Sequence, residues 1–255
     1  MKWIIPAVAG LLAASVAMAQ KAPVAIADYV AAAVADPGRE KDRVNDKRRK
    51  VGELVAFSGA KPGDRVLELV PGSGYFTRVF SKVVGPKGNV YAVWPTEYDN
   101  VSHPDSDKLR AVAKQPGYTN INVLIQPAAK LTAPKPLDVV FTSQNYHDYP
   151  DPFMGPTDPA ILNKAVFKAL KPGGVFVIID HVAEAGSGQR DTDTLHRIDP
   201  AIVKKQLQAA GFEFVGESKV LRNAKDDHKL KVFDPKIRRH TDQFAYKFRK
   251  PLAKT

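Results

Sequence analysis

The sequence predicts an open, doubly wound α/β fold around a mostly parallel sheet. Along its 255 residues, short apolar runs typical of buried strands alternate with segments whose apolar residues recur at helical spacing. One such unit, from Val66 through an amphipathic helix to Val93, fits within about thirty residues, the size of one strand–helix–strand unit. The two strands of such a unit lie parallel, with a right-handed connection between them. The chain is long enough for one domain with a complete core.

The first 19 residues have the pattern of a secretory signal. Lys2 precedes an apolar run over residues 3–16, and Ala17-Met-Ala19 stands before Gln20 as a cleavage site. A membrane anchor is the alternative, but the run is shorter than the roughly 20 residues that a spanning helix needs. We therefore expect a mature protein that begins at Gln20, is periplasmic or secreted, and has no transmembrane segment after cleavage.

Residues 20–39 are expected to form an N-terminal extension and residues 40–255 a single domain. Gly59 ends an early helix, the turn Lys61-Pro-Gly-Asp64 leads into the first strand, and Gly85-Pro-Lys-Gly88 ends the first crossover helix. In this half of the chain we expect a short helix within residues 22–38, helices over 40–58, 75–84 and 103–117, and strands over 66–69, 90–93 and 121–125.

In the second half, two helices begin with an aspartate followed by proline, Asp158-Pro159 and Asp199-Pro200, which is a favoured N-cap and first-turn pair. The run over residues 175–179 is the most apolar strand and is therefore expected at the centre of the sheet, covered on both faces. Residues 137–142 form another strand. No helical pattern separates 212–220 from 244–248, so we expect these last two strands to pair antiparallel across a long, charged connection.

Charge and composition limit the partners. The formal net charge is +11, which favours anionic partners such as envelope components. The basic residues are interspersed with acids, as in Arg39-Glu-Lys-Asp-Arg43, and no aromatic residues alternate with them to stack bases, so nucleic-acid binding is not expected. The chain has no cysteine, which excludes disulfides and thiolate chemistry.

The turn from Glu68 to Gly74 is the best candidate for a ligand site. A buried strand runs into this glycine-containing turn and then directly into a helix, so backbone N–H groups and the positive end of the helix face a ligand at the carboxyl end of the strand. The alternative is a tight turn that only packs the helix on the strand.

Several segments together resemble the class I S-adenosylmethionine-dependent methyltransferases. They are the strand, turn and helix over residues 66–77 and the segment from Leu170 to Asp180. More narrowly, the chain is similar to exported, predicted methyltransferases of Gram-negative bacteria through residues 145–148, 194–199 and 232–235. The resemblance covers residues 40–250 and implies a seven-stranded sheet that ends in an antiparallel hairpin, with S-adenosylmethionine over the carboxyl ends of the first two strands.

The family's first motif is an acid followed by three glycines at alternate positions. Glu68, Gly72 and Gly74 match it, while Val70 replaces the first glycine. Trp94 stands where an acid normally binds the ribose, and could stack on adenine instead; Glu97 could replace that acid. No acid occurs at Gln126-Pro127, where the family often contacts adenine. The cofactor-binding residues that the resemblance implies are Glu68, Val70, Pro71, Gly72, Ser73, Gly74, Tyr75, Trp94 and Asn145.

His147 is the best candidate for a general base. It follows the strand over 137–142 on the same rim as the glycine turn, and Asp148 or a neighbouring carboxylate could orient its imidazole. A loop histidine that only caps the strand end is the equal alternative, because methyl transfer mainly needs alignment of donor and nucleophile. The expected substrate contacts are Tyr146, His181, His196 and Arg197.

A metal site is not assigned, because the spacing of these histidines and carboxylates matches no compact ligand motif. The leading hypothesis is a methyltransferase that uses S-adenosylmethionine to methylate an unidentified small molecule. The alternatives are a degenerate binding protein of the same fold in the periplasm, and a metal-dependent enzyme that uses a rim formed by His147, His181 and His196.

Overall fold

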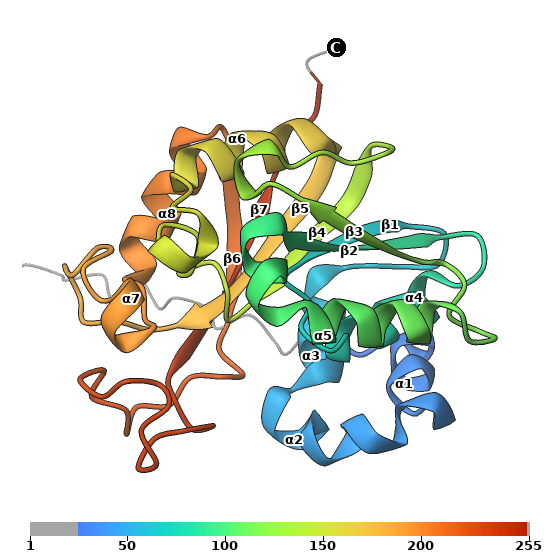
Figure 1. The fold of residues 1–255 in the computed structure, drawn as a ribbon, viewed down its shortest axis with the longest axis horizontal. Helices are drawn as coiled ribbons and strands as arrows, with labels where there is room; N and C mark the ends of the chain where they lie inside the picture. Colours follow the sequence, from blue (N-terminus) through green and yellow to red (C-terminus); the bar gives the residue numbers. More distant parts are fainter. Residues whose placement is uncertain (1–24, 254–255) are drawn as a thin grey trace, which may run out of the picture.

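A single mixed sheet organises the computed structural model, which describes residues 25–253 (Figure 1). Its seven strands lie in the order β3-β2-β1-β4-β5-β7-β6, and every neighbouring pair from β3 to β5 is parallel. The strands are β1 (Arg65–Leu69), β2 (Asn89–Pro95), β3 (Ile121–Gln126), β4 (Leu137–Ser143), β5 (Leu170–His181), β6 (Glu213–Ser218) and β7 (Gln243–Arg249). The predicted fold class is confirmed, including the antiparallel pairing of β6 with β7.

Helices cover both faces of this sheet (Figure 1). One layer contains α1, α3, α4 and α5, and the other contains α6 and α8. The α-helices are α1 (Asp28–Val34), α2 (Asp46–Arg49), α3 (Val51–Ser58), α4 (Tyr75–Val84), α5 (Thr96–Ala113), α6 (Pro159–Ala169), α7 (Thr192–Leu195) and α8 (Pro200–Ala209). Three 3₁₀ helices complete the described elements, namely η1 (Pro37–Asn45), η2 (Ala128–Lys130) and η3 (Pro152–Met154).

The strand predicted to be central, β5, lies between β4 and β7 and is buried on both faces. Because side chains alternate along a strand, Val177 and Ile179 join the core under α3 and α4, whereas Phe176 and Ile178 join the core under α6 and α8. β5 is longer than predicted, since the backbone from Leu170 continues the ladder with β4.

The N-terminal region differs from the prediction of one helix over residues 40–58. Lys50 adopts a left-handed conformation with φ 51°, which separates α2 from α3 and turns the apolar face of α3 onto the sheet. The helix expected over 103–117 begins earlier, at Thr96, directly after β2. α1 lies in the segment expected to be an extension, yet its Val30 and Ala33 are buried in the common core.

The predicted signal, residues 1–19, lies outside the described residues. Within residues 25–253, no helix has both the length and the apolar character that crossing a membrane requires.

Candidate functional site

The glycine turn after β1 has an unusual backbone. Val70, Gly72 and Gly74 all have positive φ angles, of 49°, 56° and 84°. This conformation costs glycine little, but it is strained for a β-branched residue. An added Cβ would meet Leu109 at 2.5 Å from Gly74, whereas at Gly72 it would project into open space. The lack of a side chain at Gly74 therefore lets Leu109 pack against the turn, whereas at Gly72 it leaves space above the turn.

A cavity of about 550 Å³ opens above this turn at the carboxyl ends of β1 and β4. Most of the sequence-predicted site residues line it, and Gly74, Trp94, Tyr146 and Arg197 do not. Side chains that sequence reasoning missed also line it, among them Arg49, Tyr98, Phe153 and Phe233. The predicted residues that line it are Glu68, Val70, Pro71, Gly72, Ser73, Tyr75, Asn145, His147, Asp148, His181 and His196.

Contacts from the N-terminal helices fix the turn. Arg78 of α4 forms an ion pair with Asp42 of η1 at 2.6 Å and donates a hydrogen bond to the carbonyl oxygen of Ser73 at 2.8 Å. The Tyr75 hydroxyl donates to Asp46 at 2.6 Å. Residues 37–49 thus hold the turn from outside, which motif comparison alone does not reveal.

Glu68 lies beneath the turn and is 3% exposed. The Thr77 hydroxyl donates a 2.6 Å hydrogen bond to its Oε2 atom. Burial raises the pKa of Glu68 to about 8, against the opposing effect of Thr77 and the Arg49 guanidinium. The side chain is therefore largely protonated at neutral pH.

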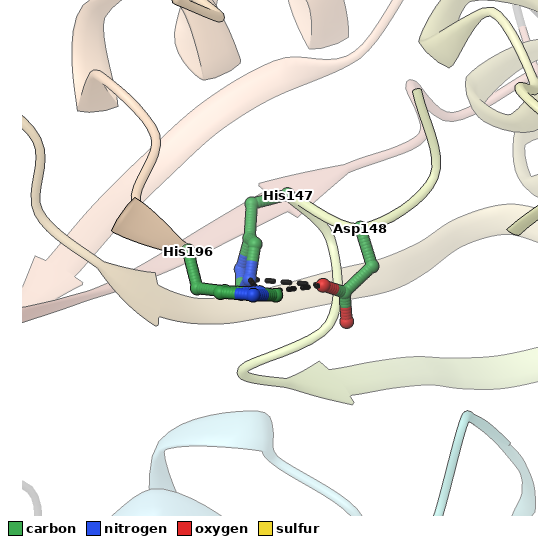
Figure 2. Close-up of side chains that lie close together, drawn as sticks. All are labelled: His147, Asp148 and His196. Carbon is green, nitrogen blue, oxygen red and sulfur yellow. Dashed lines mark hydrogen bonds and ion pairs between the residues drawn. The ribbon is translucent and has the colours of Figure 1, made fainter. Parts of the chain in front are cut away.

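Polar groups after β4 and β5 form a second wall of the cavity. His147 Nδ1 lies 2.8 Å from Asp180 Oδ1, and its Nε2 lies 3.0 Å from Asp148 Oδ1. His196 Nδ1 lies 3.3 Å from His147 Nε2 and 3.5 Å from the same oxygen of Asp148. Figure 2 shows both imidazoles directed at that oxygen. All three histidines of the predicted rim line the cavity, but Asp148, and not His181, contacts both His147 and His196.

The geometry does not support the expected role of His147 as a general base. Both of its ring nitrogens contact carboxylates, so neither is free to take a proton from a substrate. Burial opposes the charged form, but Asp180 and Asp148 outweigh it and raise the pKa of His147 to about 10. The pKa of Asp148 falls to about 2, because hydrogen bonds from both histidines outweigh burial.

His181 differs from the other two histidines. Burial lowers the pKa of its imidazole to about 3, and its Nδ1 atom lies 2.8 Å from the Thr241 hydroxyl. His181 thus presents a neutral ring to the cavity, and it joins β5 to the start of β7.

Trp94 requires a correction. It was expected to stack on adenine, but strand alternation places it on the same face as Val90 and Ala92, fully buried in the core beneath α5. Glu97 does not replace the missing acid either. Its carboxylate accepts a hydrogen bond from the backbone N–H of Ala128 at 3.1 Å, and it does not line the cavity.

The sequence predicts that Tyr146 and Arg197 contact the substrate, but in the structure both are structural residues. The hydroxyl of fully buried Tyr146 accepts a hydrogen bond from Asn163 and donates one to Gln206, which links α6 to α8. Arg197 forms a buried, two-pronged ion pair with Asp226, with distances of 2.9 and 3.1 Å. Neither side chain reaches the cavity, because each is fully engaged inside the core.

A second cavity, of about 830 Å³, adjoins the first. The two share Arg49, Phe76, Ser143 and Gln144 in their walls. No aspartate or glutamate is among the described residues that line this second cavity, which we call the basic cavity. Its cationic lining residues are Lys47, Arg48, Arg49, Lys50, Arg222, Lys225, Lys236 and Arg239.

Most of these cations are not neutralised. Lys50 and Arg222 form ion pairs with acids outside the wall, whereas the other six have no ion pair within residues 25–253. Burial and the neighbouring Arg239 guanidinium lower the pKa of Arg48, so two like charges face each other here. The run Lys47–Lys50 supplies four of these cations, but only folding brings the connection between β6 and β7 against it.

Arg49 belongs to both cavities and is half-buried. Its guanidinium carbon lies 4.4 Å from the ring centre of Tyr75 and 4.8 Å from that of Phe76, within the range of cation–π contacts. Among the described residues it has no ion-pair partner. This leaves a positioned cation between the glycine turn and the basic cavity.

Comparisons with known proteins agree with this architecture. The family model of protein-L-isoaspartate(D-aspartate) O-methyltransferase matches residues 48–215. A protein-L-isoaspartate O-methyltransferase of Ignicoccus hospitalis is 30% identical over 129 residues, 50% of this chain and 52% of the relative. A ubiquinone/menaquinone biosynthesis C-methyltransferase UbiE of Pasteurella multocida is 31% identical over 127 residues, 49% of this chain and 43% of the relative. The chain thus spans about half the length of these relatives.

Solved structures share the fold at low sequence identity. A SAM-dependent methyltransferase of Aquifex aeolicus aligns with a TM-score of 0.57 at 20% identity and covers 84% of this chain and 93% of its own. The glycopeptide N-methyltransferase MtfA complexed with S-adenosyl-L-methionine aligns with a TM-score of 0.53 at 16% identity, over 79% of this chain and 87% of its own. With the family model matching well over half of its residues, this chain belongs to the protein-L-isoaspartate(D-aspartate) O-methyltransferase family, among the class I methyltransferases that its sequence resembles.

Proposed function

We propose that this protein is an S-adenosylmethionine-dependent methyltransferase that acts on a small anionic acceptor carrying a carboxylate. The observation that carries the acceptor class is the basic cavity, whose described lining includes eight lysines and arginines and no acid. Clustered, unneutralised cations in a concave surface raise the local concentration of anions. The relatives named for transfer to isoaspartate, a carboxylate, support the same acceptor class.

The donor would bind in the cavity above the glycine turn. S-adenosylmethionine supplies an electrophilic methyl group on a sulfonium together with a free carboxylate. Gly72 leaves open space where any side chain would project, so a ligand can approach the backbone of the turn. Arg49 borders the same cavity and has no ion pair within residues 25–253, so its guanidinium would bind the donor's carboxylate.

A carboxylate acceptor is consistent with the engagement of both ring nitrogens of His147 by carboxylates. Carboxylates are ionised near neutral pH, so an oxygen nucleophile is available without proton removal. The protein's contribution is then to hold the acceptor in line with the methyl group, which is the main requirement of this reaction. The cations of the basic cavity, among them Lys236 and Arg239, would hold the acceptor beside the donor.

Calorimetric titration of the protein with S-adenosylmethionine and S-adenosylhomocysteine tests the donor. We expect one equivalent of each to bind. Absence of heat and of any thermal shift at millimolar ligand would contradict a methyltransferase and leave the degenerate binding protein as the better account.

Charge reversal in the basic cavity tests the acceptor separately. The double variant Lys236→Glu/Arg239→Glu should weaken binding of a fluorescent hexaglutamate peptide by about tenfold or more, with unchanged affinity for S-adenosylmethionine. Lys87→Glu, an exposed change at the opposite end of the sheet, is the matched control. Equal peptide affinity in the double variant and the control would contradict an anionic acceptor. It would not bear on S-adenosylmethionine as the donor.

We also propose export to the periplasm, which would give access to anionic envelope components. The support is the signal pattern over residues 1–19. Cell fractionation followed by N-terminal sequencing should find the protein outside the cytoplasm and beginning at Gln20. Recovery from the cytoplasm with Met1 intact would contradict the proposal.

A further inference from the structure

We propose that His147, Asp148 and His196 bind a single divalent transition-metal ion such as Zn²⁺ or Fe²⁺. Each residue offers one ligand atom, and the three atoms lie within 4.8 Å of one another. Figure 2 shows the three side chains close together. The site shares the cavity with the glycine turn but uses none of the turn's residues, and binding of the ion does not depend on methyl transfer. It differs from the rim considered in the sequence, because Asp148 takes the place of His181.

The spacing of the three ligand atoms fits one ion. His147 Nε2 lies 3.0 Å from Asp148 Oδ1 and 3.3 Å from His196 Nδ1, and the latter two atoms are 3.5 Å apart. Metal–ligand bonds of roughly 2.1 Å place neighbouring ligands about 3.0 Å apart at right angles and about 3.4 Å apart in a tetrahedron. The observed triangle therefore matches three ligands on one side of an ion.

Surrounding contacts hold each ligand in place. Asp180 accepts at His147 Nδ1 over 2.8 Å, so a metal ion would take the place of the proton between His147 Nε2 and Asp148 Oδ1. Asn145 donates to the second oxygen of Asp148 over 3.2 Å, so Oδ1 remains for the ion. The Phe233 ring packs 5.0 Å from the His196 ring. A carboxylate behind a ligating histidine is the usual outer-shell arrangement of protein metal sites.

The donor set selects the class of ion. Two imidazoles with one carboxylate suit zinc, iron and manganese, whereas magnesium and calcium prefer oxygen ligands alone. All three residues line the cavity, so the remaining coordination positions face a ligand or water. An ion held there could bind an anionic oxygen of a substrate as a Lewis acid.

Cobalt and zinc titrations of untagged, chelator-treated protein test the site. We expect one equivalent of Zn²⁺ by calorimetry, and one equivalent of Co²⁺ with visible ligand-field absorption. His196→Ala and Asp148→Asn should each weaken binding by about 100-fold, and Asp180→Asn, which acts through His147, by about 10- to 100-fold. His196 is partly exposed, so its variant should keep the far-ultraviolet circular dichroism of the parent.

His240→Ala is the control for unspecific binding, because His240 is exposed and lies away from the site, in the wall of the basic cavity. It should leave zinc affinity and the cobalt spectrum unchanged. The proposal is overturned if the parent protein binds zinc no more tightly than His196→Ala, or if His240→Ala removes the bound equivalent. If the parent protein binds zinc but transfers no methyl group, that result would count against the proposed function and leave the metal site intact.

Discussion

His147 Nδ1 lies 2.8 Å from Asp180 Oδ1, although the two residues are 33 positions apart in the sequence. The contact arises because β4 and β5 are parallel neighbours, so Asp180, the penultimate residue of β5, meets the loop that follows β4. Asp180 also accepts from the backbone N–H groups of His147 and His181. One buried carboxylate thus holds the loop that carries the histidine rim against the sheet.

Asp180→Asn should lower the free energy of unfolding by about 1.5–3 kcal/mol, since charge-assisted hydrogen bonds to a buried group are lost. Urea denaturation measures the change. Asp193→Asn, on the exposed side of α7, should alter stability by less than about 0.5 kcal/mol. Equal midpoints for the two variants would show that Asp180 does not anchor the loop.

Arg197→Met should destabilise the protein by about 3–5 kcal/mol, because the change leaves Asp226 buried without its partner. The comparable change in an exposed pair, Arg249→Met, should cost less than about 1 kcal/mol. Thermal or urea unfolding distinguishes the two. A large loss at Arg249 or a small one at Arg197 would contradict the structural role assigned to the buried pair.

Glu68 should make stability fall as pH rises from about 4.5 to about 8, the window between its ordinary and its raised pKa. In that window the folded protein retains a proton that the unfolded chain releases, so each unit of pH removes up to about 1.4 kcal/mol. Glu68→Gln keeps the acceptor for Thr77 and removes the titration. The free energy of unfolding of Glu68→Gln should therefore equal that of the parent at pH 4.5 and exceed it by a few kcal/mol at pH 8. A constant difference across this range would show that Glu68 does not titrate with a raised pKa.

Gly72→Ala should weaken S-adenosylmethionine binding by at least about tenfold, because the new methyl group would occupy the open space above the turn. The positive φ of 56° adds a backbone cost of about 1–2 kcal/mol. Gly186→Ala is matched, since Gly186 also has a positive φ, 81°, and open space, but lies outside the cavity. The two variants should lose similar amounts of stability. Only Gly72→Ala should bind S-adenosylmethionine more weakly, as measured by titration calorimetry. Equal affinities would place the donor elsewhere.

The sequence predicted the sheet well because its strands are signalled locally. The apolar run of β5 and the strand–turn–helix at Val66–Thr77 need no distant contact to be recognised. The break at Lys50 was not predictable, since a left-handed residue between two helical patterns leaves no clear signal when it is not glycine.

The candidate site was predictable only in part. Histidines after β4 and β5 had to share a rim because parallel strands end at one edge of the sheet. The inward orientation of Trp94 and the partner of Arg197 depend on packing that motif comparison does not encode. The basic cavity joins Arg48 to Arg239 from opposite ends of the chain, so no sequence window contains it.

Transfer of labelled methyl from S-adenosylmethionine to carboxylate peptides is the most direct test of the proposed function. An isoaspartyl peptide and hexaglutamate should be compared with a phenolic quinone precursor, because methyl esters release methanol in base whereas carbon- and ether-linked methyl groups do not. The account predicts base-labile label on a carboxylate peptide, reduced in Lys236→Glu/Arg239→Glu and retained in Lys87→Glu. Base-stable label on the phenolic compound, with none on the peptides, would contradict it.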